Sequence, residues 1–133
     1  LRTFGCDTFF SSSNAVPENG ELYNVGGNSH RVACIVYGPR QVIMIVGVNK
    51  IVKDIDEAIY RVKTVCAPMN AQRLNIATPC NKTGKCMSLS KEKPFICDGC
   101  GGDTRICCNY VISAKQRHKD RIKVIIVNEN LGY

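Results

Sequence analysis

The spacing of apolar and polar residues predicts an alternation of short strands and helices. Residues 7–12 form a β-prone run that ends in a polar segment. Residues 17–20, Pro-Glu-Asn-Gly, predict a turn, because proline fixes one φ and Asn-Gly tolerates positive φ. Residues 21–25 then predict the returning strand of a hairpin, which Gly26 and Gly27 end.

The next segments alternate between helical and strand patterns. From Ser29 the apolar residues recur at helical spacing until Gly38-Pro39 ends the pattern. Residues 42–46 are a continuous apolar run, which is typical of a parallel strand covered on both faces. A longer helix is predicted from Asp54, an N-cap with Glu57 three residues later as in a capping box, to Pro68.

The rest of the chain adds a second short helix at 70–74, a long cysteine-containing loop at 78–108, and strands at 110–113 and 122–127, the last of which we expect to be buried. This pattern favours an α/β fold with an open, mostly parallel sheet and flanking helices. We expect one domain over residues 1–133, with the loop at 78–108 as an insertion. No phosphate-binding glycine motif supports a dinucleotide or nucleotide fold.

Composition narrows the class of protein. The nine cysteines are too few for a small disulfide scaffold, and no secretory signal opens the sequence, so a reducing cytoplasm is expected. No apolar run approaches the ~20 residues of a membrane span. The net charge of +7 favours anionic partners, although a solvated basic face is the simpler interpretation of the lysine-rich loop and of the basic segment 115–123.

Six cysteines within the loop carry the clearest chemistry: Cys80, Cys86, Cys97, Cys100, Cys107 and Cys108. Cys97-Asp-Gly-Cys100 has the shape of a metal knuckle, because two intervening residues let both sulfurs face one ion. Zinc would order this long loop, an iron–sulfur cluster would use the same thiolates, and free thiols or disulfides remain the third possibility. We expect zinc first, with an iron–sulfur cluster as the alternative.

Residues 13–33 resemble the central motif of the LUD (lactate utilization) domain family, close to S/T-x-N-A-x-x-x-x-G-x-L-x-N-x-x-G-x-x-x-R-x-A. The resemblance continues at 37–52, 67–74, 78–86 and 131–133. It implies a sheet fold shared with sugar-phosphate isomerases and CoA-transferases, and a chain that is the C-terminal part of the family's domain. It also implies an association with lactate or small-acid utilization, with iron–sulfur redox subunits as candidate partners.

The same resemblance suggests which cysteines bind the metal. Related sequences look like Cys-x5-Cys-x2-Cys-x6-Cys, and the Cys100-x6-Cys107 spacing matches the last step. The implied ligands are therefore Cys80, Cys86, Cys100 and Cys107. This chain departs from the pattern through a longer insertion and two extra cysteines, so Cys97 and Cys108 are kept as alternates.

A candidate ligand site lies within the resembling segment. Asn14 follows a predicted strand end, while Asn28 and Arg31 lie where a glycine-rich turn enters a helix. Arg31 is suited to clamp a carboxylate or phosphate by two parallel hydrogen bonds, so a small anionic metabolite is the expected ligand. The alternative is structural, with asparagines that satisfy turn backbones and an arginine that makes a local ion pair.

Other functional classes remain open at this point. A zinc-containing module that binds nucleic acid through 115–123 is disfavoured by the scarcity of aromatic residues there, and a non-catalytic subunit of a redox complex is a further alternative. A homo-oligomer is compatible with the sequence. Cys34 and Cys66 are predicted to be small buried apolar residues, and neither His30 nor His118 is tied to a cysteine by a known catalytic signature.

Overall fold

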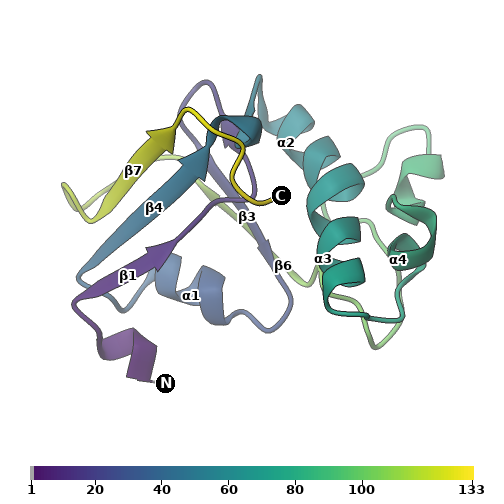
Figure 1. The fold of residues 1–133 in the computed structure, drawn as a ribbon, viewed down its shortest axis with the longest axis horizontal. Helices are drawn as coiled ribbons and strands as arrows, with labels where there is room; N and C mark the ends of the chain where they lie inside the picture. The colour runs from purple at the N-terminus through teal and green to yellow at the C-terminus, as the bar shows by residue number, and fades with distance from the viewer. Residues whose placement is uncertain (1) are drawn as a thin grey trace.

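The fold is built on a three-stranded parallel sheet. The computed structural model describes residues 2–133. After a 3₁₀ turn, η1 (Arg2–Gly5), strand β1 (Thr8–Ser11) pairs with β4 (Gln41–Gly47), and β4 pairs with β7 (Ile122–Val127). The order β1-β4-β7 is seen edge to edge in Figure 1. The strands predicted at 7–12, 42–46 and 122–127 are all confirmed.

Two strand pairs form the second part of the framework. β2 (Val16–Pro17) pairs in parallel with β5 (Ile51–Val52), and β3 (Leu22–Gly26) pairs antiparallel with β6 (Asn109–Ser113). The turn at 17–20 is confirmed, with Gly20 at a φ of 101°. The predicted hairpin is reduced to one bridge, Ala15 with Tyr23, because β2 pairs with β5 and the next amide on that edge of β3, Val25 N–H, donates to the Asn14 side chain.

Only one face of the parallel sheet is covered. Helix α1 (His30–Val36) packs there with Val16 and Leu22 against alternate residues of β4, namely Val42, Met44 and Val46. Ile45, on the opposite face, is 39% exposed, so the prediction of a strand covered on both faces is wrong. The expected burial of β7 is also wrong, because this strand forms a sheet edge and its Ile125 is 51% exposed.

A composite helix follows β5 and η2 (Val48–Lys50). Asp54 accepts a hydrogen bond from the backbone N–H of Glu57 at 2.9 Å and caps α2 (Ile55–Arg61), as predicted. The helix then widens into a π turn, η3 (Val62–Cys66), and continues as α3 (Ala67–Arg73). The predicted end at Pro68 is wrong: the proline stands at the start of α3, where the missing N–H falls in the irregular turn.

The cysteine-containing loop carries secondary structure of its own. It contains α4 (Pro79–Thr83) and a 3₁₀ turn, η4 (Met87–Ser90), and α4 packs beside α3 on the side of the molecule away from β7 (Figure 1). A second cluster of buried residues, separate from the one between α1 and β4, includes Tyr23 from β3 and Ala58 and Cys66 from this composite helix. The expected class is confirmed at this level: a mixed α/β fold with a mostly parallel sheet and flanking helices.

Arg121 joins the end of α1 to the start of β7. Its guanidinium donates to the carbonyl oxygens of Ile35 at 2.7 Å, Cys34 at 3.2 Å and Pro39 at 3.2 Å. These carbonyls lie at the C-terminal end of α1, where the helix dipole favours a cation.

We predict that Arg121→Ala lowers the free energy of unfolding by about 2–3 kcal/mol, because three partly buried carbonyl oxygens lose a charged donor. Urea denaturation measures the change. Arg117→Ala, at an exposed position in the same segment, is the matched control and should leave the midpoint unchanged. Equal midpoints for the two variants would contradict the assigned role.

Candidate functional site

A cavity of about 500 Å³ opens where the chain leaves β1, where β3 turns into α1, and where η3 joins α3. All three predicted ligand residues, Asn14, Asn28 and Arg31, line it. The structure therefore brings together residues that are separated by up to 17 positions in the sequence. This placement agrees with the rule that ligands of open α/β folds bind beyond strand ends.

Arg31 holds the wall of this cavity. Its Nη1 donates to Ser12 O at 2.9 Å and to Asn24 Oδ1 at 2.6 Å. Its Nη2 donates to Asn14 Oδ1 at 2.7 Å and to Val25 O at 3.0 Å. Four of the five guanidinium N–H donors are thus used inside the protein, so Arg31 shapes the cavity and has little capacity left for a ligand.

Asn14 completes the same junction. Its Oδ1 accepts a second hydrogen bond from the backbone N–H of Val25 at 2.8 Å. The side chain therefore fastens the segment after β1 to the end of β3. Asn28, in contrast, is exposed on the cavity rim and keeps its amide for other partners. His30 also lines the rim and is exposed.

The cavity is lined by cations and by no acidic side chain. Besides Arg31 and His30, its lining residues include Lys50, Arg73 and Arg105, and none is aspartate or glutamate. The ion pairs found within residues 2–133 lie elsewhere, between Arg40 and Asp7 and between Lys91 and Asp98. The positive charge of the cavity therefore has no counter-charge within the described part of the chain.

Lys50 is the most deeply placed of these cations. It is only 6% exposed, and its Nζ donates to Ser12 Oγ at 3.1 Å. Burial, together with the nearby Arg61 and Arg31 guanidinium groups, lowers the pKa of Lys50, while Cys66 opposes the shift. Arg73 lies at another part of the wall, where it donates to Tyr133 Oη at 2.5 Å and to Asn70 Oδ1 at 2.9 Å.

Cys66 lies in the same group of residues. It is buried, as is Cys34, which confirms the expected burial of both. Its Sγ accepts a hydrogen bond from Arg61 Nη1 at 2.7 Å, so it has a polar partner that the apolar helical pattern did not reveal. Burial raises the pKa of Cys66, although Arg61 and Lys50 favour the thiolate.

A second, smaller cavity of about 30 Å³ lies within the cysteine-containing loop. Cys80, Cys86, Cys100 and Cys107 all line it, whereas the alternates Cys97 and Cys108 are exposed and outside it. Burial and the neighbouring Cys80 and Cys86 raise the pKa of Cys107 to about 12. No group of three or more His, Cys, Asp or Glu side chains in residues 2–133 is already arranged as a metal site.

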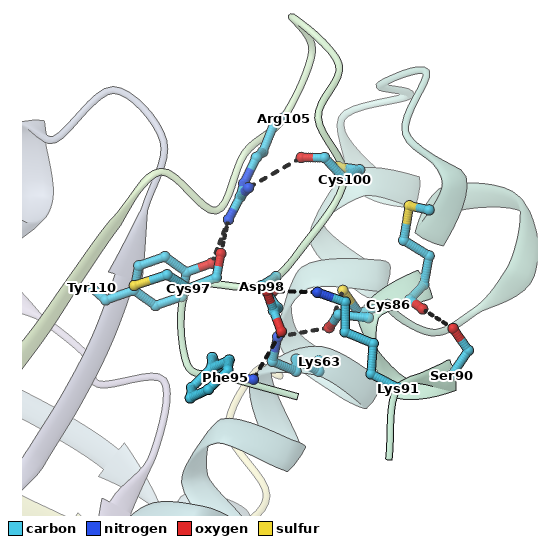
Figure 2. A network of polar contacts seen from close by, with 12 residues as sticks. Lys63, Cys86, Ser90, Lys91, Phe95, Cys97, Asp98, Cys100, Arg105 and Tyr110 are labelled. Carbon is cyan, nitrogen blue, oxygen red and sulfur yellow. Dashed lines mark hydrogen bonds and ion pairs between the residues drawn. The ribbon is translucent and has the colours of Figure 1, made fainter. Parts of the chain in front are cut away.

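Two cations hold this loop together. Arg105 donates to the carbonyl oxygens of Cys107 at 2.8 Å, Cys100 at 3.1 Å and Cys97 at 2.7 Å, and to Tyr110 Oη at 2.9 Å. Lys63 donates to Ser88 Oγ at 2.8 Å and to Asp98 O. Figure 2 shows how these contacts connect distant parts of the loop to η3 and β6, so part of its order comes from cations.

The comparison with family models decides the family. The model for the LUD domain matches residues 1–127 of the 133. The chain belongs to the LUD domain family. No curated protein and no solved structure matches it at a significant level. None of the helices described for this LUD domain is long and apolar enough to cross a membrane.

Sequence reasoning missed the residues that give the LUD cavity its charge. Lys50 and Arg73 lie in segments that resemble the family, but no spacing in the sequence links either residue to Asn14 or Arg31. Their joint position depends on η2, which carries Lys50, and on the π turn that precedes α3, which carries Arg73. In the basic segment, Arg121 is committed to α1 and Lys123 donates to Gln41 Oε1 at 2.6 Å, which leaves fewer cations for nucleic acid.

We predict that Arg31→Lys lowers the free energy of unfolding of the LUD domain by about 2–4 kcal/mol, because an ammonium group cannot replace the guanidinium at four partly buried hydrogen bonds. Chemical denaturation measures the loss. Arg40→Lys, at an exposed ion pair, is the control and should change stability little. An unchanged midpoint for Arg31→Lys would contradict the wall-forming role.

Proposed function

We propose that this LUD domain binds a small anionic metabolite in the large cavity and a thiolate-bound metal ion in the cysteine-containing loop. Membership of the LUD family suggests a function related to lactate utilization. The observation that carries the first part is the uncompensated positive charge of the cavity wall. Buried cations without an acidic counter-charge are costly, and an anion that enters the cavity removes part of that cost.

The donors available to the anion are those that the protein itself does not use. Lys50 Nζ has one acceptor among the described residues, Ser12 Oγ, and Arg73 Nη1 has none. Asn28 adds an amide on the rim. A carboxylate is well suited to this set, since a guanidinium and an ammonium both form short, charge-assisted hydrogen bonds to it. Arg31 contributes by holding Asn14 and the β3 end in place.

The metal proposal depends on four cysteines that line one small cavity, although no three of them are arranged as a metal site within residues 2–133. The four cysteines around the small cavity are the same four that the family spacing implies. Thiolates placed together in a buried space repel one another, and a divalent cation removes this repulsion. Arg105 and Lys63 supply positive charge around the loop, which would offset the excess negative charge of a four-thiolate ion. A metal ion bound by these four cysteines would have a structural role.

The small volume of the cavity favours zinc over an iron–sulfur cluster. A space of about 30 Å³ suits a single ion better than a cluster of several iron and sulfide atoms. The rival nucleic-acid function has less support, since Arg121 serves the fold. A complex with iron–sulfur redox subunits remains compatible with both parts of the proposal, because such subunits would exchange electrons with small organic acids.

We predict that Arg73→Met weakens the binding of L-lactate about tenfold to a hundredfold, since one charge-assisted hydrogen bond is lost. Isothermal titration calorimetry at low ionic strength measures the affinity, and sulfate serves as a second anionic probe. Lys53→Met, an exposed cation outside the cavity, is the control. If neither lactate nor sulfate binds the wild-type protein, the anion site does not exist.

We predict that the purified protein holds about one zinc ion per chain, and that Cys100→Ser removes it. Elemental analysis gives the metal content, and the visible spectrum separates colourless zinc from a brown cluster. Cys108→Ser is the matched control, because this cysteine is exposed and lies outside the small cavity, and it should keep the metal. Protein prepared under reducing conditions with neither metal would overturn this part.

A further inference from the structure

The two buried lysines of the chain differ in how they are satisfied. Lys63, 4% exposed, has a hydroxyl and a carbonyl oxygen as acceptors, Ser88 Oγ and Asp98 O, as expected for a structural ammonium group. Lys50, 6% exposed, has only the Ser12 hydroxyl among the described residues. Its Nζ has three hydrogens in the charged form, so two of them have no acceptor within residues 2–133.

The surroundings of Lys50 oppose its positive charge. Burial, Arg61 from α2 and Arg31 from α1 lower the pKa of Lys50, and Cys66 from η3 acts in the opposite direction. Arg61 is itself fixed close by, because its Nε donates to the carbonyl oxygen of Asn49 at 3.1 Å. Burial beside two other cations lowers the pKa of a lysine amine and so increases the fraction of it that is neutral and nucleophilic.

We propose that Lys50 is a covalent catalytic residue that forms an iminium ion with a 2-oxo acid bound in the cavity. This inference rests on the proposed function, because the cavity must first admit the carboxylate. Lys50 lines the cavity, and the proposal requires that its Nζ is reached from the space that a bound ligand would occupy. A small carboxylate with an adjacent ketone uses both properties of the cavity: the remaining cations hold the carboxylate, and the amine attacks the carbonyl carbon.

The reaction balances without an external oxidant or reductant. The lone pair of the neutral Lys50 amine forms a bond to the carbonyl carbon, and the carbonyl oxygen takes up the proton that leaves nitrogen, which gives a carbinolamine. A second proton on that oxygen lets it leave as water, and the carbon–nitrogen double bond forms with a positive nitrogen. Ser12 Oγ, 3.1 Å from Nζ, is placed to relay the proton between nitrogen and oxygen.

Covalent attachment would also change the electrostatics of the cavity. The oxo acid adds a negative charge beside Arg73 and Lys50, while the iminium nitrogen carries one positive charge that the reacting neutral amine lacks. The iminium withdraws electrons from the neighbouring carbon–hydrogen bonds of the ligand. The chemistry therefore points to reactions in which a proton leaves the carbon next to the former ketone.

The test is reductive trapping. Wild-type protein is incubated with pyruvate and sodium borohydride, digested, and mapped by mass spectrometry. We expect the reduced pyruvate adduct on Lys50 and none on Lys63, which is the matched buried lysine. Lys50→Arg, checked for folding by circular dichroism, should abolish the adduct. Because the mapping uses the wild-type protein, the result does not depend on how well the variant folds.

The pH dependence of trapping is the second measurement. Neutral amine reacts, so the initial trapping rate should rise with pH and level off below the ordinary pKa of a lysine, because Arg61, Arg31 and burial lower the pKa of Lys50. Nonspecific modification of fully exposed lysine side chains in general would continue to increase towards higher pH. A profile that follows the exposed lysines would overturn the proposal.

Lactate separates this proposal from the anion site. It carries the carboxylate but no carbonyl, so it should bind and compete with pyruvate without forming an adduct. If lactate and pyruvate both bind and no adduct forms on Lys50, the covalent role fails while the anion site stands. If neither binds and no adduct forms, the anion site and the covalent role both fail.

Discussion

The arrangement of the site depends on the buried guanidinium of Arg31. This one group joins the segment after β1, through Ser12 and Asn14, to the end of β3, through Asn24 and Val25. These segments belong to different strand pairs, and no ladder hydrogen bond runs directly between β1 and β3. The Arg31 side chain therefore connects two segments that the strand ladders do not connect. The rigidity of this cavity wall depends on the planar guanidinium, whose donors have a fixed geometry.

The buried cations at the cavity are expected to lower the stability of the fold and to favour the binding of an anion. Lys50 and Arg61 are buried near Arg31, and within the described chain no carboxylate balances them. A protein under selection for stability alone would be expected to pair or remove these charges, since one unpaired buried charge costs several kcal/mol. Their joint presence is easier to explain as a preformed environment for an anion, in which the ligand completes the electrostatics that folding leaves incomplete.

The sequence predicted the elements better than their surroundings. Strand positions, the turn at 17–20 and the Asp54 cap follow from local rules, and the structure confirms them. Burial of β4 and β7 was predicted wrongly, because an apolar run reports the preference of a segment for a strand but not how many faces other elements cover. Pro68 misled for a similar reason: a π turn before it accommodates a residue that would otherwise end the helix.

For the candidate site too, the sequence predicted individual residues better than their contacts in the folded chain. Asn14, Asn28 and Arg31 were predicted as ligand residues, and all three line the cavity. The sequence did not reveal that the Arg31 guanidinium is saturated by acceptors of the protein, nor that Lys50 lines the same cavity with one acceptor. Which arginine is saturated depends on backbone carbonyl oxygens that only the folded chain brings together. The four family-spaced cysteines lie around one small cavity, whereas only Cys100 of the local Cys97-x-x-Cys100 motif lines it and Cys97 is exposed.

The π turn at Val62–Cys66 has a consequence for how this region tolerates change in length. Each added or removed residue rotates the following helix by roughly 100° about its axis. Shortening the turn by one residue would restore regular winding but would carry Asn70 and Arg73 away from Tyr133 and the cavity. The π turn lets α2 and α3 each direct a different face toward its own neighbours. We therefore expect natural variants to preserve the number of residues in the turn more strictly than the identity of its side chains.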